Sequence, residues 1–157
     1  MKSLVSVVML GILLVSSSAQ ARLFGRFRGQ SSGGGQVTHA ESLDSYKGPM
    51  YPVEEQLLQR INEQRARYGL RALALDPLAH LRARRHAAWM ANHQSMVHST
   101  DGAENIAMGY PSVEAAVNGW MNSSGHRANI LNPNYRFTGI AGYTAPSGTI
   151  FWCEQFM

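Results

Sequence analysis

Residues 120–131, WMNSSGHRANIL, join the end of an amphipathic helix to a run of polar side chains. Apolar residues recur at helical spacing after Ser112, which can cap the helix: Val113, Ala116, Val117, Trp120 and Met121. One further helical turn is predicted over residues 128–131, before Asn132 and Pro133 break it. The polar residues 122–127 are therefore expected at a helix end or in a loop, where side chains can face a site.

Two more helices are predicted upstream. The first begins at Pro52 and stops at Gly69. The second has Asp76 as its cap and Pro77 as its first residue, and it ends near Asn92. Four apolar residues of this second helix are expected to face the core: Leu78, Leu81, Ala88 and Trp89.

Two strands are predicted at the end of the chain. They lie within residues 138–144 and 149–156, and the turn 145–148 joins them as a hairpin. Residues 150–153 are apolar on both faces, so the second strand should be central and covered by helices. Helices around an antiparallel sheet indicate an α+β layered fold.

The charge of the chain lies mainly outside the predicted domain. The net charge is +4 and the pI is near 9.6. From Tyr51 onward nine arginines face eight carboxylates, so the domain is nearly neutral and no nucleic-acid partner is predicted. Seven of these arginines lie between Arg60 and Arg85. We interpret Arg82, Arg84 and Arg85 as a solvated helix face; the alternative is a surface for an anionic envelope component such as a wall polymer or lipid headgroup.

Cys153 is the only cysteine, so no disulfide can form within the chain. It lies in an apolar strand pattern, and we predict a buried, unreactive thiol. The hydrophobic core must then stabilise the domain without the disulfides that small exported domains often use.

Residues 1–21 are predicted to be a cleavable signal peptide. Lys2 supplies the positive charge, Leu4–Val15 is almost entirely apolar, and residues 19–21 read Ala-Gln-Ala. The apolar run is shorter than the ~20 residues that a transmembrane helix needs. We therefore expect export to the periplasm or the medium, with no transmembrane segment after cleavage.

The following residues, 22–50, are rich in Arg, Gly and Ser and are predicted to be a flexible linker. The alternative is a basic tether in which Arg22, Arg26 and Arg28 touch an anionic surface. Residues 51–157 are predicted to form one domain.

The candidate site residues lie between the second helix and the hairpin. They are His98, Glu104 and His126, with Asn105 and residues 122–127 beside them. Two imidazoles and one carboxylate are a ligand set that zinc can use. The structural alternative is that these side chains only form hydrogen bonds that hold their loops. A nucleophilic serine two or three residues before His126 would rarely have the geometry for proton transfer.

Five segments occur in the order and spacing of one family: HS at 98–99, ENIA at 104–107, WMNSSGHRANIL at 120–131, GIA at 139–141 and FWCEQF at 151–156. On these segments the chain from about Val53 to Phe156 resembles the CAP superfamily. The superfamily comprises cysteine-rich secretory proteins, antigen 5, plant pathogenesis-related proteins and bacterial relatives. The chain looks most like the compact, disulfide-free bacterial SCP-like type.

The resemblance implies a three-layer α-β-α sandwich with a central antiparallel sheet and an open cleft. It also implies a cavity tetrad of two histidines and two acidic residues that can hold a divalent metal. His98, Glu104 and His126 match three of the four positions, but Asn122 and Ser123 stand where the fourth, a glutamate, would be. Because a carboxylate ligand is missing, zinc binding at His98, His126 and Glu104 is expected to be weak or absent.

Three functions remain open from the sequence. We expect a non-enzymatic secreted module whose polar cleft binds a lipid, glycan or peptide, since the proteins it resembles include sterol and lipid binders. The second hypothesis is a hydrolase in which the cluster activates water to cleave peptide or cell-wall substrates. The third is an envelope interaction protein that uses the arginine-rich second helix.

Overall fold

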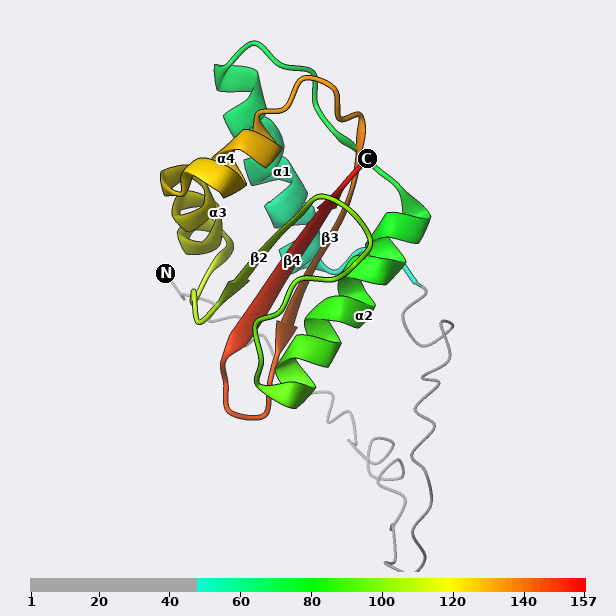
Figure 1. Ribbon diagram of the computed structural model, residues 1–157, viewed down its shortest axis with the longest axis vertical. Coiled ribbons are helices and arrows are strands. Elements are labelled where there is room, and N and C mark those ends of the chain that lie inside the picture. Colours follow the sequence, from blue (N-terminus) through cyan, green and yellow to red (C-terminus); the bar gives the residue numbers. More distant parts are fainter. Residues whose placement is uncertain (1–47) are drawn as a thin grey trace, which may run out of the picture. The chain divides into compact units, whose positions relative to one another are not determined.

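The computed structural model describes residues 48–157 (Figure 1). The predicted signal peptide and nearly all of the predicted linker lie outside these residues. The described elements, in chain order, are α1 Pro52–Arg67, β1 Ala74–Leu75, α2 Pro77–His93, β2 Glu104–Met108, α3 Val113–Asn122, α4 Ser124–Ile130, β3 Phe137–Thr144 and β4 Ile150–Phe156.

The four strands form one sheet in the order β1-β3-β4-β2. The predicted hairpin is confirmed as β3 and β4, which pair antiparallel from Thr138 opposite Phe156 to Thr144 opposite Ile150. The strand β4 is central, as predicted, and β2 pairs antiparallel with its other edge. The two-residue strand β1 adds a parallel pair beside β3 that the sequence pattern did not predict.

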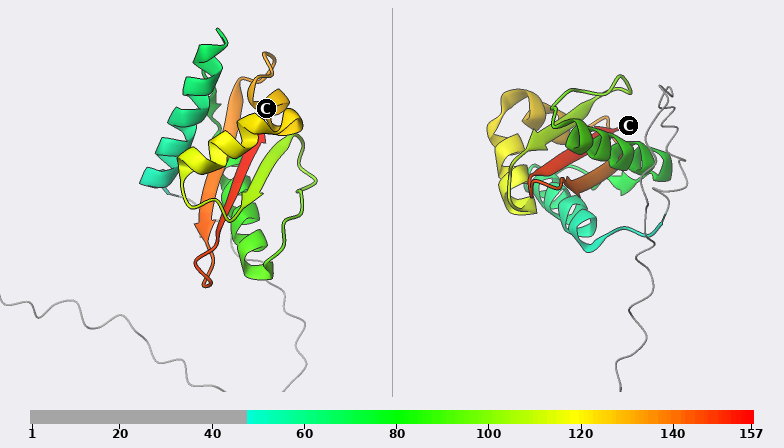
Figure 2. Two further views of the ribbon diagram at one scale, coloured as in Figure 1. Left: turned by 90° about the vertical axis from the view of Figure 1, so that its left-hand side faces the viewer. Right: turned by 90° about the horizontal axis from the view of Figure 1, so that it is seen from below.

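Helices cover both faces of the sheet, which confirms the α-β-α sandwich. The helix α2 lies on one face, and α1, α3 and α4 lie on the other (Figure 2). Because side chains alternate along a strand, neighbouring residues of β4 enter different cores. Trp152 packs with Leu57, Ile61 and Trp120 on the α1 and α3 side. Cys153 packs on the α2 side, and its predicted burial is confirmed.

The predicted helix starts are confirmed by their caps. The Asp76 side chain accepts a hydrogen bond from the backbone N–H of Ala79, and Ser112 does the same for Ala115. These contacts satisfy backbone donors that a helix leaves unpaired at its first turn. The boundaries of α1, α2 and α3 therefore follow from local sequence.

The prediction that Leu78 and Trp89 face the core is wrong, because their residues are 52% and 42% exposed. The face of α2 that contacts the sheet is made largely of alanines, which allow the helix to lie unusually close to β3. At Gly139 an added Cβ would be only 2.0 Å from the backbone carbon of Ala79. The contact therefore requires small residues where α2 crosses Gly139, and Leu78 and Trp89 lie outside the buried face that Leu81 and Met90 share with the alanines.

The prediction of a solvated arginine face on α2 is also wrong at Arg84. Its guanidinium Nε and Nη2 lie 2.8 and 2.5 Å from the two carboxyl oxygens of Glu54, and both side chains are buried. Burial alone would raise the pKa of Glu54, but hydrogen bonds from Arg84 and the backbone of Tyr51, together with His80 whose Nε2 lies 3.5 Å away, lower it to about 2. This ion pair joins α1 to α2.

Two elements around the candidate site differ from the prediction. Glu104 and Asn105 were expected in a loop, but they begin the strand β2. The last helix, α4, begins at Ser124 rather than at residue 128, so His126 is a helical residue. Both differences come from contacts with β4 and α3 that no local pattern reveals.

Candidate functional site

Glu104 is the centre of the candidate site and is almost completely bonded. It lies at the start of β2, opposite Gln155 of β4, and its side chain is 1% exposed. Its carboxylate accepts hydrogen bonds from the Ser99 backbone N–H at 3.1 Å, the Ser99 hydroxyl at 2.7 Å and the Gln155 amide at 3.2 Å. The His98 Nδ1 lies 3.0 Å from its Oε1. The carboxylate therefore holds the segment 98–99 against the sheet.

These hydrogen bonds keep Glu104 ionised. Burial alone would raise the pKa of its carboxyl group. The hydrogen bonds from Ser99 and Gln155, together with the charge of His86, outweigh burial and hold the pKa below its ordinary value. A buried anion with this many donors is a fixed structural charge.

His86 connects α2 to the site. Its Nε2 lies 2.8 Å from the carbonyl oxygen of Val97, and because a carbonyl only accepts, Nε2 carries the proton. The same nitrogen is 3.7 Å from Oε1 of Glu104. His86 thus fixes the segment that leads into His98.

His98 is the most exposed member of the group, with a side chain that is 58% exposed. Since a carboxylate only accepts hydrogen bonds, Nδ1 donates to Glu104 and Nε2 is left for a ligand. A carboxylate that binds one ring nitrogen of a histidine fixes the tautomer and the ring direction. The ring of His98 is therefore presented in one orientation.

His126 lies on α4, which covers the face of the sheet opposite α2 (Figure 2). Asn105 donates to the backbone oxygen of His126 at 3.1 Å and accepts from the amide of Asn129 at 3.0 Å, which anchors α4 on β2. Burial, and then the charge of His98, lower the pKa of His126 below its ordinary value of 6.5. A pKa below 6.5 leaves His126 largely neutral at pH 7, and His126 is near enough to His98 to respond to its charge.

The other predicted site residues are less closely involved. Asn122 is exposed at the end of α3, and Ser123 is half-buried at the junction of α3 and α4. Within residues 48–157 neither side chain is hydrogen-bonded to His98, Glu104 or His126. The structure thus joins two of the five predicted residues, His98 and Glu104, by a hydrogen bond, while His126 is linked to His98 only through charge.

Sequence reasoning missed His86, Ser99 and Gln155. His86 lies on the second helix and Gln155 on the last strand, both outside the predicted site residues. The available signals were the Ser that follows His98 and the alternation that places Gln155 on the same face as Cys153. Neither signal identifies a partner until the pairing of β2 with β4 is known.

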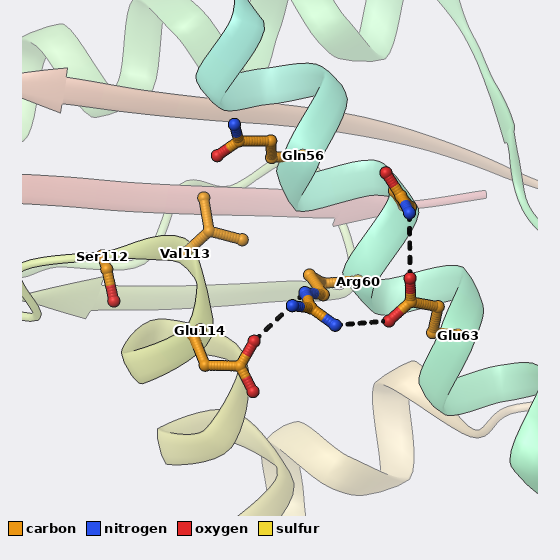
Figure 3. Close-up of a pocket in the computed structure, with 7 residues that line it drawn as sticks. Gln56, Arg60, Glu63, Ser112, Val113 and Glu114 are labelled. Carbon is orange, nitrogen blue, oxygen red and sulfur yellow. Dashed lines mark hydrogen bonds and ion pairs between the residues drawn. The ribbon is translucent and has the colours of Figure 1, made fainter.

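A hollow lies between α1 and α3, away from these residues (Figure 3). This groove has a volume of 440 Å³ and is polar. Arg60 crosses it, 2.7 Å from a carboxyl oxygen of Glu63 and 3.1 Å from one of Glu114. The charged side chains that line this groove are thus paired with one another. None of the predicted site residues lines the groove.

Comparison with known proteins decides the family. The sequence profile of the Cysteine-rich secretory protein family (CAP) matches residues 58–156, more than half of the chain. The chain belongs to the CAP family. Residues of this CAP domain and their neighbours are 34% identical over 122 residues to the uncharacterized protein YkwD of Bacillus subtilis, covering 66% of this chain and 46% of that protein. The chain spans less than half the length of the curated relatives it matches.

Solved CAP structures agree with the fold. An extracellular protein with an SCP domain from Bacillus anthracis is 27% identical, with a TM-score of 0.57, covering 71% of this chain and 45% of that one. An outer surface protein of Borrelia burgdorferi has a TM-score of 0.59 at 19% identity, covering 65% of this chain and 89% of that one. The second likeness shows the fold alone.

The CAP domain does not present a complete metal site among its described residues. No group of three or more His, Cys, Asp and Glu side chains there is arranged to hold a metal ion. The oxygens of Glu104 already accept hydrogen bonds from Ser99, Gln155 and His98, so Glu104 supports His98 instead of facing a metal. His98 and His126 are too few ligands for zinc. We therefore derive no chemistry through a metal.

Ser123 and Ser124, the serines that precede His126, form no hydrogen bond with its ring in the described part of the CAP domain. The two serines lie at the start of the same short helix. Residues 48–157 include no helix long and apolar enough to cross a membrane.

Proposed function

We propose that this CAP-domain protein is an exported binding module whose ligand contacts His98 and His126. The observation that carries the proposal is the fully bonded carboxylate of Glu104, which fixes the exposed ring of His98. A preorganised side chain loses little conformational entropy when it binds, so a fixed and exposed ring favours recognition.

The proposed ligand is polar and of the glycan or peptide class. The groups we assign to the ligand are the imidazoles of His98 and His126, with the exposed amide of Asn122 and the hydroxyl of Ser123 a few residues before His126 in the chain. These groups donate and accept hydrogen bonds, which suits sugar hydroxyls and peptide groups. The buried apolar side chains of the two cores do not reach this surface.

Export to the periplasm or medium is part of the proposal. It is supported by the pattern of residues 1–21 and by the solved relatives, of which one is an extracellular protein and another an outer surface protein. A CAP domain at the cell envelope would meet glycan and peptide together in the wall.

A hydrolase is the second candidate, because His98 and Glu104 form a histidine–carboxylate pair at 3.0 Å. Such a pair can make an imidazole a general base toward water. Glu104 itself is a poor base, since its pKa is lowered and its oxygens are occupied. Turnover of the bound molecule would distinguish this candidate from a binding module.

The test uses soluble peptidoglycan fragments, which carry both glycan and peptide, and isothermal titration calorimetry. We expect wild-type protein to bind the fragments, and His98→Ala and His126→Ala each to weaken binding about tenfold, as the loss of one well-placed hydrogen-bonding group does. His93→Ala is the matched control, because His93 is an exposed histidine at the end of α2.

Mass spectrometry of the fragments after incubation completes the test. Unchanged fragments support the binding module, whereas new cleavage products that disappear with His98→Ala support the hydrolase. The proposal fails if wild-type protein does not bind, or if His93→Ala weakens binding as much as the two site variants do.

A further inference from the structure

One end of the domain is organised by a buried arginine. Arg65, near the end of α1, is 0% exposed and donates to the backbone oxygens of Arg71 at 2.8 Å, Ile130 at 2.6 Å and Asn132 at 3.0 Å. These contacts gather the end of α1, the α1–β1 connection, the end of α4 and the α4–β3 connection. Figure 1 shows these segments together at the upper end of the domain.

Four exposed arginines surround this point: Arg67, Arg71, Arg127 and Arg136. We call them the arginine end. The Nη2 of Arg127 donates to the hydroxyl of Tyr68 at 2.7 Å and its guanidinium carbon lies 5.2 Å from the centre of that ring, which ties α4 to the end of α1. In the described part of the chain none of the four forms an ion pair with a carboxylate.

The nearby carboxylates do not neutralise the arginine end. Glu63 is close enough to feel the charge of Arg67, but it is already bound by Arg60 at 2.7 Å. Glu154 lies in the core rather than on this surface, and burial raises its pKa well above the ordinary value. Burial lowers the pKa of Arg65; the charge of Glu154 partly offsets this, and the like charge of Arg136 lowers the pKa further.

We propose that the arginine end is a docking surface for an anionic lipid membrane. Guanidinium groups bind phosphates with two parallel hydrogen bonds. The arginine end presents four guanidinium groups that form no ion pair with a described carboxylate. Two half-exposed aromatic residues flank them in sequence: Tyr68 after Arg67 and Phe137 after Arg136. Aromatic rings beside basic side chains suit the boundary between headgroups and acyl chains, and this favours a membrane over a soluble polyanion.

This inference is independent of the site at His98 and His126. The sequence pattern had suggested α2 as the basic surface, but Arg84 of α2 is buried against Glu54. The arginine end is therefore a different basic surface from the one that the sequence suggested. The two surfaces come from different residues, so each can be tested without disturbing the other.

The test compares two variants of the full chain that remove equal charge. Arg67→Gln/Arg71→Gln changes the arginine end, and Arg82→Gln/Arg85→Gln changes α2. Binding is measured by co-sedimentation with vesicles of phosphatidylglycerol and phosphatidylcholine, and with vesicles of phosphatidylcholine alone. Each basic side chain near an anionic surface contributes about fivefold, so we expect the first variant to lose roughly 25-fold in affinity and the second to lose little.

Both variants are the full mature chain from Arg22, so the apolar signal peptide does not bind the vesicles and any contribution of Arg22, Arg26 and Arg28 is the same in each. Thermal unfolding checks that both variants fold. The proposal is overturned if the two variants lose binding equally, if only the α2 variant loses it, or if binding does not require phosphatidylglycerol. It is also overturned if the arginine-end variant loses binding to soluble polyphosphate while its vesicle binding is unchanged.

Discussion

Glu154 shows how a single buried side chain can set the pH dependence of this CAP domain. It lies on the central strand, opposite Asn105, and is 0% exposed. The amide of Asn105 approaches it, but neither carboxyl oxygen has a hydrogen-bond partner of normal geometry among the described residues. Burial therefore raises its pKa well above 4.5, only partly offset by the positive charge of Arg65.

The sign of the resulting pH effect follows from this raised pKa. The folded state holds the proton of Glu154 more tightly than the unfolded state, so its contribution to stability is full below pH 4.5 and falls as pH rises through the folded pKa. Glu154→Gln cannot ionise, and we expect it to raise the free energy of unfolding by roughly 1–3 kcal/mol at pH 8 relative to wild type. Urea unfolding at pH 4 and pH 8 measures this.

The difference between Glu154→Gln and wild type should be small at pH 4, where both side chains are neutral. An equal effect at both pH values would mean that Glu154 ionises freely in the fold. A loss of stability at pH 8 would mean that its carboxylate has a favourable partner.

At the level of elements, the Glu54–Arg84 ion pair joins α1 to α2. Removing one partner of a buried pair leaves an uncompensated charge, so Arg84→Ala is expected to cost about 3–5 kcal/mol at pH 7. Arg85→Ala, on the exposed neighbour, should change stability by less than about 0.5 kcal/mol. Urea unfolding of the two variants is the measurement.

Lowering the pH should reduce the difference in unfolding free energy between Arg84→Ala and Arg85→Ala. The pKa of Glu54 is lowered to about 2, so the pair stabilises the fold above pH 4.5 and its contribution is lost as pH falls toward 2. The loss of unfolding free energy caused by Arg84→Ala should therefore become smaller as the pH falls from 4.5 toward 2. A cost that is the same at pH 2.5 as at pH 7 would show that Arg84 acts through packing alone.

The contact between α2 and β3 gives a second prediction at this scale. A Cβ at Gly139 would be 2.0 Å from the backbone of Ala79, so Gly139→Ala must displace the helix and should cost more than about 3 kcal/mol. Gly125→Ala is the matched control, because nothing lies within 4 Å of its added Cβ and alanine favours the helix α4.

Thermal unfolding should place Gly139→Ala well below wild type and Gly125→Ala at or above it. Failure of Gly139→Ala to accumulate, with normal production of Gly125→Ala, would also show that the close packing of α2 on β3 needs glycine at position 139. Equal melting temperatures for the two variants would show that α2 does not pack closely on β3.

The elements that the sequence could predict are those set by neighbours in the chain. Asp76 and Ser112 mark helix starts because each caps a residue three positions on. The strand β2 was missed because its partner is distant: Glu104 contacts Gln155, 51 residues away. Arg84 was misplaced for the same reason, since its partner Glu54 lies 30 residues earlier.

In the candidate site, too, the sequence could predict what local motifs carry but not what distant partners provide. His98, Glu104 and His126 could be singled out from short motifs, whose residue types and order are visible in the sequence. The support around Glu104 could not, because His86, Ser99 and Gln155 come from three segments that only the fold brings together.

For the whole molecule, export predicts a defined mature protein. Cleavage after the Ala-Gln-Ala of residues 19–21 should leave a chain that begins at Arg22. Intact-mass analysis of the protein recovered outside the cytoplasm measures this directly. A product that retains residues 1–21, or that stays with the cytoplasmic fraction, would contradict the proposed export.

The binding site at the β2 edge of the sheet is the central claim, and histidine NMR tests it most directly. Soluble peptidoglycan fragments would be added to protein labelled with ¹⁵N in its histidine rings. We predict that the ring resonances of His98 and His126 shift together and saturate, while those of His93 on α2 stay unchanged. Shifts at His93 without shifts at His98 and His126, or no shift at any of them, would contradict the account.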